Sequence, residues 1–294
     1  MKILITGGKG FIARNLAEGL GADYDISAPG RQELDLLDAQ CTASFIKAGR
    51  FDAIIHCATY DAAPKTSAKD PAKVLENNLK MFFNIARNSG DFGRLVYYGS
   101  GAEFGRENWK PRMSEDYFDE HVPSDQYGFS KYLMTRYALK SENIYNLRLF
   151  GTFGRYDDWR YRFLPNICAR LVLDLPLVVG QNRRVDLLYI DDLVKMTDWL
   201  LKAKAPRKVY NACSGQANDY LSLVNDAMRV SGKTAELAVT RPGNGAEYSG
   251  DNARIMKDSG LVLTPMDRAI EALVGWYRAN PGHLDREQIL SYPL

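Results

Sequence analysis

The chain alternates short apolar runs with longer amphipathic stretches. The apolar runs are rich in β-branched residues and are typical of buried strands. They are Lys2–Thr6, Tyr24–Ala28, Ala53–Cys57, Arg94–Tyr98, Asn143–Leu149 and Lys208–Ala212. Apolar residues at helical spacing lie between them, near residues 11–20, 38–48, 71–89, 126–141 and 191–204. Asp191 is the expected N-cap of the last helix. This alternation predicts an α/β fold with a parallel, doubly wound sheet of the Rossmann type.

The pattern weakens after about residue 151. Residues 155–186 and 214–294 are richer in Gly, Pro, Arg and Asn, and predict loops and short helices. We therefore expect a dinucleotide-binding domain of residues 1–154 plus about 186–212. A smaller C-terminal cap of about 155–185 and 213–294 would bind the substrate. Ligands of such sheets bind outside the carboxyl ends of the strands, so the two parts are expected to share one cleft.

The composition excludes several classes of protein. The chain has 294 residues, 46% hydrophobic and 25% charged, with a formal net charge of +2. This balance gives no reason to expect nucleic acid or a membrane surface as a partner. The first strand begins at once, and no apolar stretch is long enough to cross a bilayer. Four cysteines without a C-x-x-C pair, and three scattered histidines, predict reduced thiols in a cytoplasm and no metal site.

A glycine-rich turn follows the first strand directly and leads into the first helix. It reads Gly7-Gly8-Lys9-Gly10-Phe11-Ile12-Ala13. Gly7 permits a tight turn, Gly10 lets the backbone approach a pyrophosphate, and Ala13 is small enough for close helix–strand packing. The helix N-terminus then supplies amide N–H groups for phosphate. This context favours a dinucleotide-binding turn over an ordinary glycine turn.

Tyr127 and Lys131 are the candidate catalytic pair. They lie four residues apart, on one face of the predicted helix. A nearby ammonium favours phenolate and lowers the pKa of a tyrosine, which makes Tyr127 a candidate general acid/base for a carbinol oxygen. Ser100 follows a strand, at the same edge of the sheet, and can hydrogen-bond the same oxygen. The alternatives are that Ser100 only satisfies its turn and that Lys131 is a surface charge.

These residues resemble motifs of a known family. The motifs are Thr6-Gly7-Gly8-Lys9-Gly10-Phe11-Ile12, His56-Cys57-Ala58, Asn78, Ser100-Gly101-Ala102-Glu103-Phe104-Gly105, Tyr127-x-x-x-Lys131, Arg148-Leu149-Phe150-Gly151-Thr152-Phe153-Gly154, Arg184–Asp192 and Asp251–Arg254. Together they resemble the extended short-chain dehydrogenases/reductases, and within them the NAD(P)-dependent nucleotide-sugar epimerase/dehydratase family. Ala13, where the family more often has Gly, is the one departure in the glycine turn. The resemblance implies an enzyme performing redox chemistry on a sugar carried by a nucleoside diphosphate. It also implies a homodimer formed by the helices near residues 71–89 and 126–141.

The resemblance places the cofactor along the carboxyl edge of the sheet, with Asp35 and Leu36 at the adenine. The expected contacts are Gly7, Gly10, Phe11, Ile12, Arg31, Asp35, Leu36, Cys57, Ala58, Asn78, Tyr127 and Lys131. NAD-specific sites usually have Asp or Glu at the end of the second strand. Here that strand runs into Ala28-Pro29-Gly30-Arg31, with Lys9 and Arg14 beside the glycine turn. Cations without a carboxylate suit a 2′-phosphate, so we expect NADP. NAD is the alternative if Arg31 is only a solvated charge.

The chain lacks residues that some reactions of the family require, and this reduces the number of possible reactions. The family's 4,6-dehydratases carry an Asp-Glu pair after the serine, whereas this chain has Gly101-Ala102, and Glu103 is expected to face the opposite side. Members of the GDP-fucose-synthase type use a Cys two residues after the serine and a His in the cap. Those positions are Ala102 and about Arg162 here. The resemblance therefore disfavours dehydration and proton transfer at sugar C3 and C5.

Two enzymatic hypotheses remain. The first is NADP-dependent reduction of the 4-keto group of a nucleotide-linked 6-deoxy sugar, with Tyr127 as proton donor. The second is an NAD-dependent 4-epimerase that retains its cofactor. A non-catalytic NADP-binding sensor is a further alternative, which the complete Ser100, Tyr127 and Lys131 set disfavours. Asn166, Arg170 and Arg184 in the cap are candidates for the diphosphate and nucleotide, because arginine suits bidentate phosphate contacts.

Overall fold

The first lobe is built on a six-stranded parallel sheet. The computed structural model describes residues 1–61 and 67–292. The strands, in spatial order, are β2 (Asp25–Ser27), β1 (Lys2–Thr6), β3 (Ala53–His56), β4 (Arg94–Ser100), β5 (Ile144–Leu149) and β9 (Val209–Ala212). Every neighbouring pair is parallel, and all six predicted strands are confirmed to within two residues at each end. The order reverses between β1 and β3, which places a ligand crevice at their carboxyl ends.

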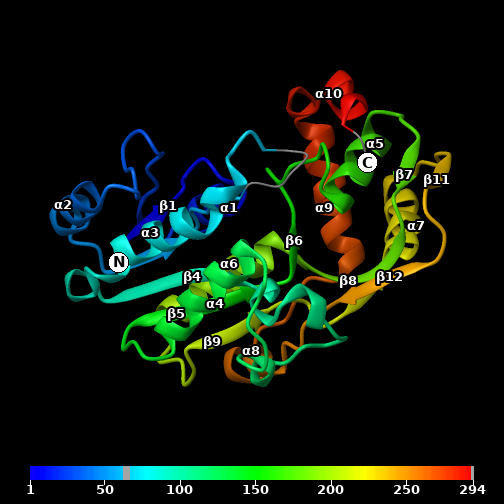
Figure 1. The fold of residues 1–294 in the computed structure, drawn as a ribbon. Coiled ribbons are helices and arrows are strands. Elements are labelled where there is room, and N and C mark those ends of the chain that lie inside the picture. Colours follow the sequence, from blue (N-terminus) through cyan, green and yellow to red (C-terminus); the bar gives the residue numbers. More distant parts are fainter. Residues whose placement is uncertain (62–66, 293–294) are drawn as a thin grey trace.

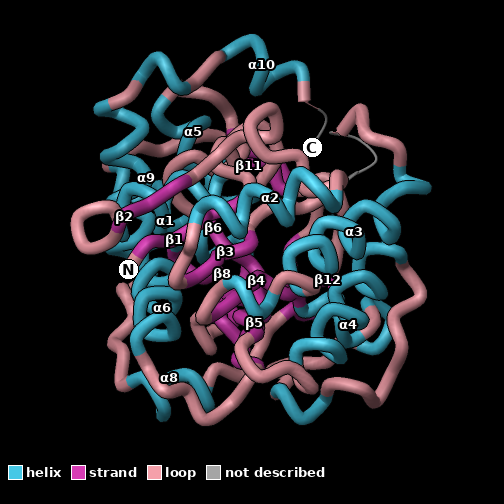
Figure 2. The backbone as a smooth tube through the Cα atoms, turned by 90° about the vertical axis from the view of Figure 1, so that its left-hand side faces the viewer, coloured by secondary structure: helices cyan, strands magenta, loops and turns pink. Residues whose placement is uncertain are grey.

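Helices cover both faces of this sheet (Figures 1 and 2). One face carries α1 (Phe11–Leu20) and α6 (Ile190–Lys202), and the other carries α2 (Ala39–Gly49), α3 (Val74–Ala86) and α4 (Gln126–Ala138). Alternation along the strands explains the two layers, because successive side chains point to opposite faces. Ile3 and Ile5 join the core beneath α1 and α6, whereas Leu4 joins the core beneath α3 and α4. The doubly wound α/β fold is confirmed.

The prediction of Asp191 as the N-cap of α6 was wrong. The N-cap is Tyr189, two residues earlier, and Asp191 lies in the first turn of the helix. There its carboxylate is 3.3 Å from the Arg155 guanidinium. A carboxylate interacts favourably with the positive end of the helix dipole both at the N-cap and in the first turn. The sequence alone therefore could not show which of these two positions Asp191 occupies.

The second lobe is more regular than the sequence pattern indicated. Its main sheet is formed by β10 (Ala217–Asp219), β8 (Asn182–Tyr189) and β12 (Asn244–Tyr248), with β6 (Gly151–Phe153) also paired to β8. A second pair joins β7 (Leu177–Val179) and β11 (Leu237–Val239). The helices are α5 (Phe163–Val172), α7 (Tyr220–Ser231), α8 (Ala253–Ser259), α9 (Met266–Ala279) and α10 (Arg286–Ser291). The prediction of loops and short helices was wrong here, because α5, α7 and α9 pack on one another and bury apolar residues at helical spacing.

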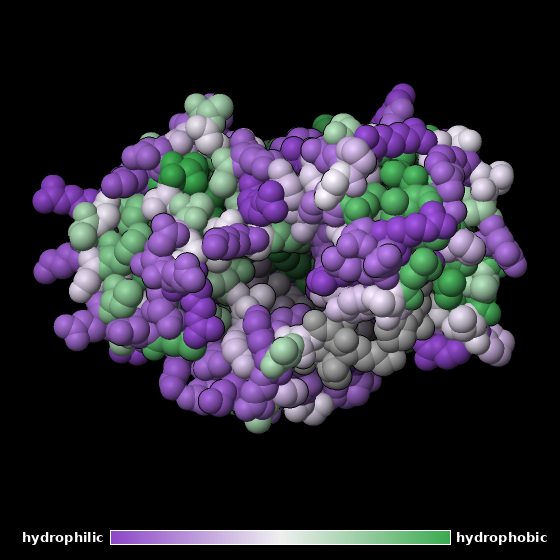
Figure 3. Space-filling model, turned by 90° about the horizontal axis from the view of Figure 1, so that it is seen from above, coloured by the Kyte–Doolittle hydropathy of each residue, from purple (hydrophilic) through white to green (hydrophobic). Residues whose placement is uncertain are grey.

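The two lobes face each other across a hollow. Seen from above, the space-filling surface is indented between them (Figure 3). Strand β8 crosses the expected domain boundary near residue 186, so the second half of this strand lies within the part assigned to the dinucleotide domain. Within the described residues, no helix is long and apolar enough to span a membrane. The same residues contain no group of three His, Cys, Asp or Glu side chains placed to hold a metal ion.

Candidate active site

The glycine turn has the geometry that close contact with a phosphate requires. Gly7 has φ of +71°, and a Cβ there would lie 3.0 Å from the Cα of Ala58. A Cβ at Gly8 would lie 2.0 Å from the Ala28 carbonyl oxygen, so no side chain fits at that position. Helix α1 has Gly10 at its N-cap and no acid in its first turn. Its first amide groups and the positive end of its dipole therefore suit a pyrophosphate. Ala13 is fully buried, as close packing predicts.

Both cationic and acidic side chains lie in the loop that follows β2. The exposed Arg31 guanidinium is 3.7 Å from the Asp35 carboxylate. Glu33 accepts a hydrogen bond of 2.8 Å from the amide of Gly30, and the Lys9 side chain lies beside the same glycine. The expectation of cations without a carboxylate was therefore wrong, because the loop after β2 folds Glu33 onto the Gly30 amide and Asp35 beside Arg31. Leu36 is buried in the core, which leaves little of its side chain for an adenine.

The carboxyl end of β3 is held by buried polar contacts. Thr6 Oγ1 lies 2.9 Å from His56 Nδ1 and accepts a hydrogen bond from the Ala58 amide at 3.2 Å. Burial lowers the pKa of His56 to about 3, and the charge of Lys131 adds to this effect. His56 is therefore neutral and serves as a structural partner of Thr6. Cys57 and Ala58 follow at the crevice and are partly exposed.

The side chain of Asn78, in α3, binds the segment that follows β3. Its amide oxygen accepts a hydrogen bond of 2.8 Å from the Tyr60 amide, and its nitrogen donates to the Tyr60 carbonyl at 3.0 Å. The Thr59 hydroxyl donates to the same amide oxygen at 3.3 Å. Both ends of the Asn78 side chain are therefore engaged by the segment after β3. Asn78 thus supports that segment, and its contact with a cofactor stays a prediction.

Ser100 and Tyr127 are brought together at the carboxyl edge of the sheet. Ser100 is the last residue of β4, and its Oγ accepts a hydrogen bond of 3.2 Å from the Ala102 amide at the start of the 3-10 helix η3 (Gly101–Phe104). Tyr127 is the second residue of α4, whose N-cap Asp125 accepts from the Gly128 amide at 2.9 Å. The Ser100 hydroxyl lies near enough to the Tyr127 phenol to act against the rise of its pKa. Ser100 thus satisfies its turn and reaches the candidate acid.

Lys131 is buried beside Tyr127, and the pKa of Tyr127 is raised rather than lowered. Its Nζ donates a hydrogen bond of 2.8 Å to the Tyr98 carbonyl and lies 5.8 Å from the centre of the Tyr127 ring. Burial raises the pKa of Tyr127 to about 12, with Asp61 adding to the rise, while Ser100 and Arg106 oppose it. The expected lowering of this pKa was therefore wrong, because burial disfavours the phenolate and the Lys131 ammonium donates its hydrogen bond to a backbone carbonyl. Tyr127 is a protonated phenol, suited to donate a proton.

Lys131 should set the alkaline limit of activity. Burial lowers its pKa to about 8, so the ammonium loses its proton as pH rises through about 8, while Tyr127 stays protonated. Its positive charge would stabilise the phenolate that Tyr127 becomes after giving up a proton. We expect kcat/KM to be constant below pH 8 and to fall above it. A pH profile in constant ionic strength measures this, and a profile flat to pH 9.5 would contradict it.

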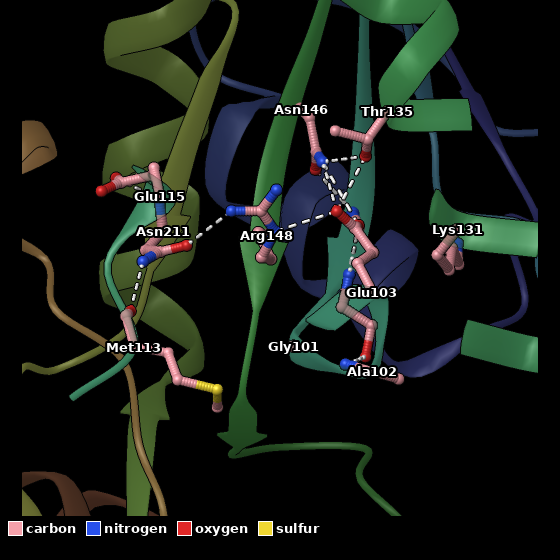
Figure 4. A network of polar contacts seen from close by, with 12 residues as sticks. Gly101, Ala102, Glu103, Met113, Glu115, Lys131, Thr135, Asn146, Arg148 and Asn211 are labelled. Carbon is pink, nitrogen blue, oxygen red and sulfur yellow. Dashed lines mark hydrogen bonds and ion pairs between the residues drawn. The ribbon is translucent and has the colours of Figure 1, made fainter. Parts of the chain in front are cut away.

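Glu103 points away from the crevice, as expected (Figure 4). Its Oε2 is 2.9 Å from Arg148 Nε, and both side chains are fully buried. Its Oε1 accepts a hydrogen bond of 2.9 Å from the Ser100 amide. Thr135 and Asn146 also donate to this carboxylate. Glu103 therefore holds the backbone of Ser100 from below and is not placed to exchange protons with a substrate.

Two of the three cap candidates are structural. The Asn166 amide donates to the carbonyls of Trp159 and Arg160 at 3.0 and 2.9 Å. Arg170 donates to Asn166 Oδ1 at 2.9 Å and to the Ile289 carbonyl at 3.3 Å, and both side chains are buried. These groups hold α5 to its neighbours, and their substrate contacts stay a prediction. Arg184 remains a candidate to bind the substrate, because its side chain is exposed. Its guanidinium lies 3.6 Å from the Glu247 carboxylate.

The structure adds one residue that no sequence motif indicated. Tyr248, at the end of β12, places its hydroxyl beside Gly101, the residue that follows Ser100. Its ring stacks on Trp109, with ring centres 4.0 Å apart, and the Trp109 indole donates to the Gly101 carbonyl at 3.0 Å. Residue 248 is far from residue 100 in sequence and belongs to no recognisable spacing. Only the folded chain brings this phenol to the site.

Comparison with known proteins supports the arrangement. Residues 3–213 match the model of the NAD dependent epimerase/dehydratase family. The chain is 23% identical over 186 residues to GDP-L-colitose synthase of Yersinia pseudotuberculosis, covering 58% of this chain and 60%, less than two thirds, of that protein. It is 24% identical to UDP-glucose 4-epimerase of Lactobacillus helveticus, covering 97% and 100% of the two chains. A GDP-mannoheptose C4 reductase from Campylobacter jejuni with NADP bound has a similar fold, with a TM-score of 0.79, 19% identity and coverage of 94% and 98%.

Proposed function

Because the chain belongs to the NAD dependent epimerase/dehydratase family, we propose that it reduces the 4-keto group of a nucleotide-linked 6-deoxy sugar with NADPH. The family consists of NAD(P)-dependent enzymes that act on nucleotide sugars. The observation that supports this reaction is the pairing of Ser100 with a protonated Tyr127 at the carboxyl end of β4. A ketone reduction needs one proton donor and one group to hold the carbonyl oxygen, and this pair supplies both.

The residues present fit a dinucleotide along the crevice from Gly7 to Lys131. The turn after β1 and the start of α1 suit the pyrophosphate, and buried Lys131 lies at the other end of the crevice. When bound, the reduced nicotinamide supplies a hydride to the C4 carbonyl carbon. Tyr127 then gives its proton to the C4 oxygen, so that the ketone gains two hydrogens and becomes an alcohol. Ser100 donates a hydrogen bond to that oxygen, and Lys131 balances the charge left on Tyr127.

Other reactions of the family have less support. The Glu103 carboxylate is buried with Arg148 and cannot act in a dehydration. Ala102 carries no titratable group, and Arg162, at the N-cap of α5, stays protonated at neutral pH. The chain therefore lacks the Cys and His that, by the resemblance, proton exchange at sugar C3 and C5 would need.

A 4-epimerase is the second candidate, because Glu33 and Asp35 lie beside Arg31 at the end of β2. A carboxylate at this place suits the ribose 2′-hydroxyl of NAD, whereas Arg31 and Lys9 suit the 2′-phosphate of NADP. We place NADP first because the Asp35 carboxylate is 3.7 Å from Arg31 and both side chains are largely exposed. Such a surface pair contributes less than about 1 kcal/mol and can open for a phosphate.

The test is turnover with GDP- and dTDP-linked 4-keto-6-deoxy sugars. We expect NADPH oxidation, followed at 340 nm, and a product two mass units heavier than the substrate. The rate with NADH should be at least about tenfold lower, as one lost charge-assisted phosphate contact implies. Substitution of Arg184 should raise the KM for the nucleotide sugar.

Two other outcomes would each replace the proposal. If denatured protein releases stoichiometric NAD⁺ and the native protein interconverts UDP-glucose and UDP-galactose, the protein is an epimerase. If it binds NADPH, turns over no substrate and is unaffected by Tyr127→Phe, it is a sensor.

We also propose a homodimer through α3 and α4. These helices present Tyr137, 41% exposed, next to Phe83, with ring centres 5.2 Å apart. Light scattering coupled to gel filtration should give twice the mass of 33.1 kDa. A single-chain mass at micromolar concentration would exclude a stable dimer.

A further inference from the structure

Arg106 lies at the point where the helix that carries Tyr127 begins. It is the first residue of the 3-10 helix η4 (Arg106–Asn108). Its Nε is 3.3 Å from the carboxylate of Asp125, which is the N-cap of α4. Its guanidinium also lies over the Trp109 ring, 5.4 Å from the ring centre. These two contacts hold a cation beside the first turn of α4, where Tyr127 is the second residue.

The Asp125 carboxylate gives the ion pair a reason to persist. Its Oδ1 accepts a hydrogen bond of 2.9 Å from the Gly128 amide and so caps the helix. Its Oδ2 is buried and accepts no hydrogen bond within the described part of the chain. A buried, charged oxygen of this kind is costly unless a cation lies close to it. Arg106 is the one cation that pairs with Asp125 among the described residues. The guanidinium is therefore held near the N-terminus of α4.

Tyr127 is left with a negative charge when it gives its proton to the C4 oxygen. Burial raises the pKa of Tyr127 to about 12, and the charge of Arg106 acts in the opposite direction. The Lys131 ammonium donates its hydrogen bond to the Tyr98 carbonyl, and burial lowers its pKa to about 8. An arginine, by contrast, keeps its charge at every pH at which an enzyme works. Arg106 therefore remains a cation when Lys131 has become neutral.

We propose that Arg106 is a positioning residue, whose permanent charge stabilises the anion left on Tyr127 after proton transfer. This inference rests on the proposed function, and it adds a second cation to the site besides Lys131. The charge on Tyr127 develops only during the reaction, so Arg106 acts on kcat and not on substrate binding. The Arg106 side chain is 51% exposed, and water and salt therefore limit the size of the effect.

Replacement of the charge tests the proposal. Arg106→Met keeps an apolar stem against Trp109, and we expect kcat to fall about three- to tenfold, the range of one partly screened charge, with KM nearly unchanged. Arg106→Lys should restore most of the loss. Arg112→Met is the matched control, because Arg112 also follows η3 and pairs with an exposed acid, Asp251, at 3.5 Å. The control should leave kcat unchanged. A fall of kcat in the control as large as in Arg106→Met would contradict a specific role.

A second background separates the charge from a structural role. Asp125→Ser keeps a residue that caps helices well and removes the carboxylate. If Arg106 serves only to hold Asp125, Arg106→Met has no effect on kcat in this background, and the proposal fails. If its charge acts on Tyr127, kcat falls in this background as well.

A titration tests the same idea without turnover. The analogue 3,5-difluorotyrosine, which ionises at lower pH than tyrosine, replaces Tyr127 and is followed by fluorine NMR. The charged and polar groups that face this phenol are Asp61, Ser100, Glu103, Arg106, Lys131 and Arg162. Arg106→Met should raise the midpoint by about 0.5 to 1 pH unit, the same factor expressed as a titration, whereas Arg106→Lys and Arg112→Met should not.

The titration distinguishes failure of this inference from failure of the proposed function. An unchanged midpoint in Arg106→Met would overturn the role of Arg106, even in an active reductase. A raised midpoint in a protein that oxidises no NADPH would retain this role and reject the reductase assignment.

Discussion

Replacing Tyr127 with phenylalanine should lower kcat about 100- to 10,000-fold, the usual contribution of a general acid. The reason is that Tyr127 is a protonated, partly exposed phenol near Ser100 at the carboxyl edge of the sheet. Tyr248 is also protonated, but its hydroxyl is turned toward Gly101. The measurement is single-turnover oxidation of NADPH with the nucleotide 4-keto sugar in excess.

Cofactor binding serves as the control for this variant. The phenol contributes no charge, so NADPH affinity, followed by fluorescence, should change less than about threefold because at most one hydrogen bond is lost. A kcat within fivefold of the unsubstituted protein would show that another group donates the proton. A simultaneous loss of NADPH binding would instead indicate that α4 has been displaced.

Replacing Arg148 with methionine should destabilise the fold by about 3–5 kcal/mol, because it leaves the buried Glu103 carboxylate without its cation. Both side chains are fully buried, 2.9 Å apart. Arg148 also donates to Asn211 Oδ1 at 3.1 Å, and Asn211 in turn donates to the Met113 carbonyl at 2.9 Å. The change therefore removes a link between β5 and the segment that contacts the cap. The midpoint of thermal unfolding should fall by roughly 5–10 °C.

An exposed ion pair provides the matched control. Arg268 and Glu271 lie 2.8 Å apart, with side chains 69% and 57% exposed. Arg268→Met should cost less than about 1 kcal/mol, since water screens such a pair. If both methionine variants lose the same stability, burial of the Glu103 pair is not the cause. Because Glu103 also accepts from the Ser100 amide, Arg148→Met should slow turnover even in molecules that remain folded.

The active site is supported from beneath by the same network. Glu103 holds the backbone of Ser100, while Thr135, on the helix that carries Tyr127, donates to its other oxygen at 2.8 Å. One buried carboxylate thus connects the strand that presents Ser100 with the helix that presents Tyr127. This connection limits relative movement of the two catalytic groups, which must remain within hydrogen-bond reach for proton transfer.

The sequence by itself determined the features that depend on local patterns. The strands of the first sheet follow from short β-branched runs, and the turn from Gly7 to Ala13 follows from the spacing of small residues after a strand. The common face of Tyr127 and Lys131 follows from helical geometry, and the placement of Ser100 follows from its position after β4. Each of these depends on residues within a few positions of one another, so neither register nor packing was needed to predict them.

Tertiary structure decided what depends on burial and on contacts between distant segments. Asn166 and Arg170 became supports of α5 because neighbouring carbonyls surround them. Tyr127 became a protonated acid because burial disfavours its phenolate and raises its pKa to about 12. Tyr248 lies beside Gly101 because β12 and the segment after η3 are bound together across the lobes. The free energy of a charge or a hydrogen bond depends on its surroundings, and a linear pattern contains no direct record of those surroundings.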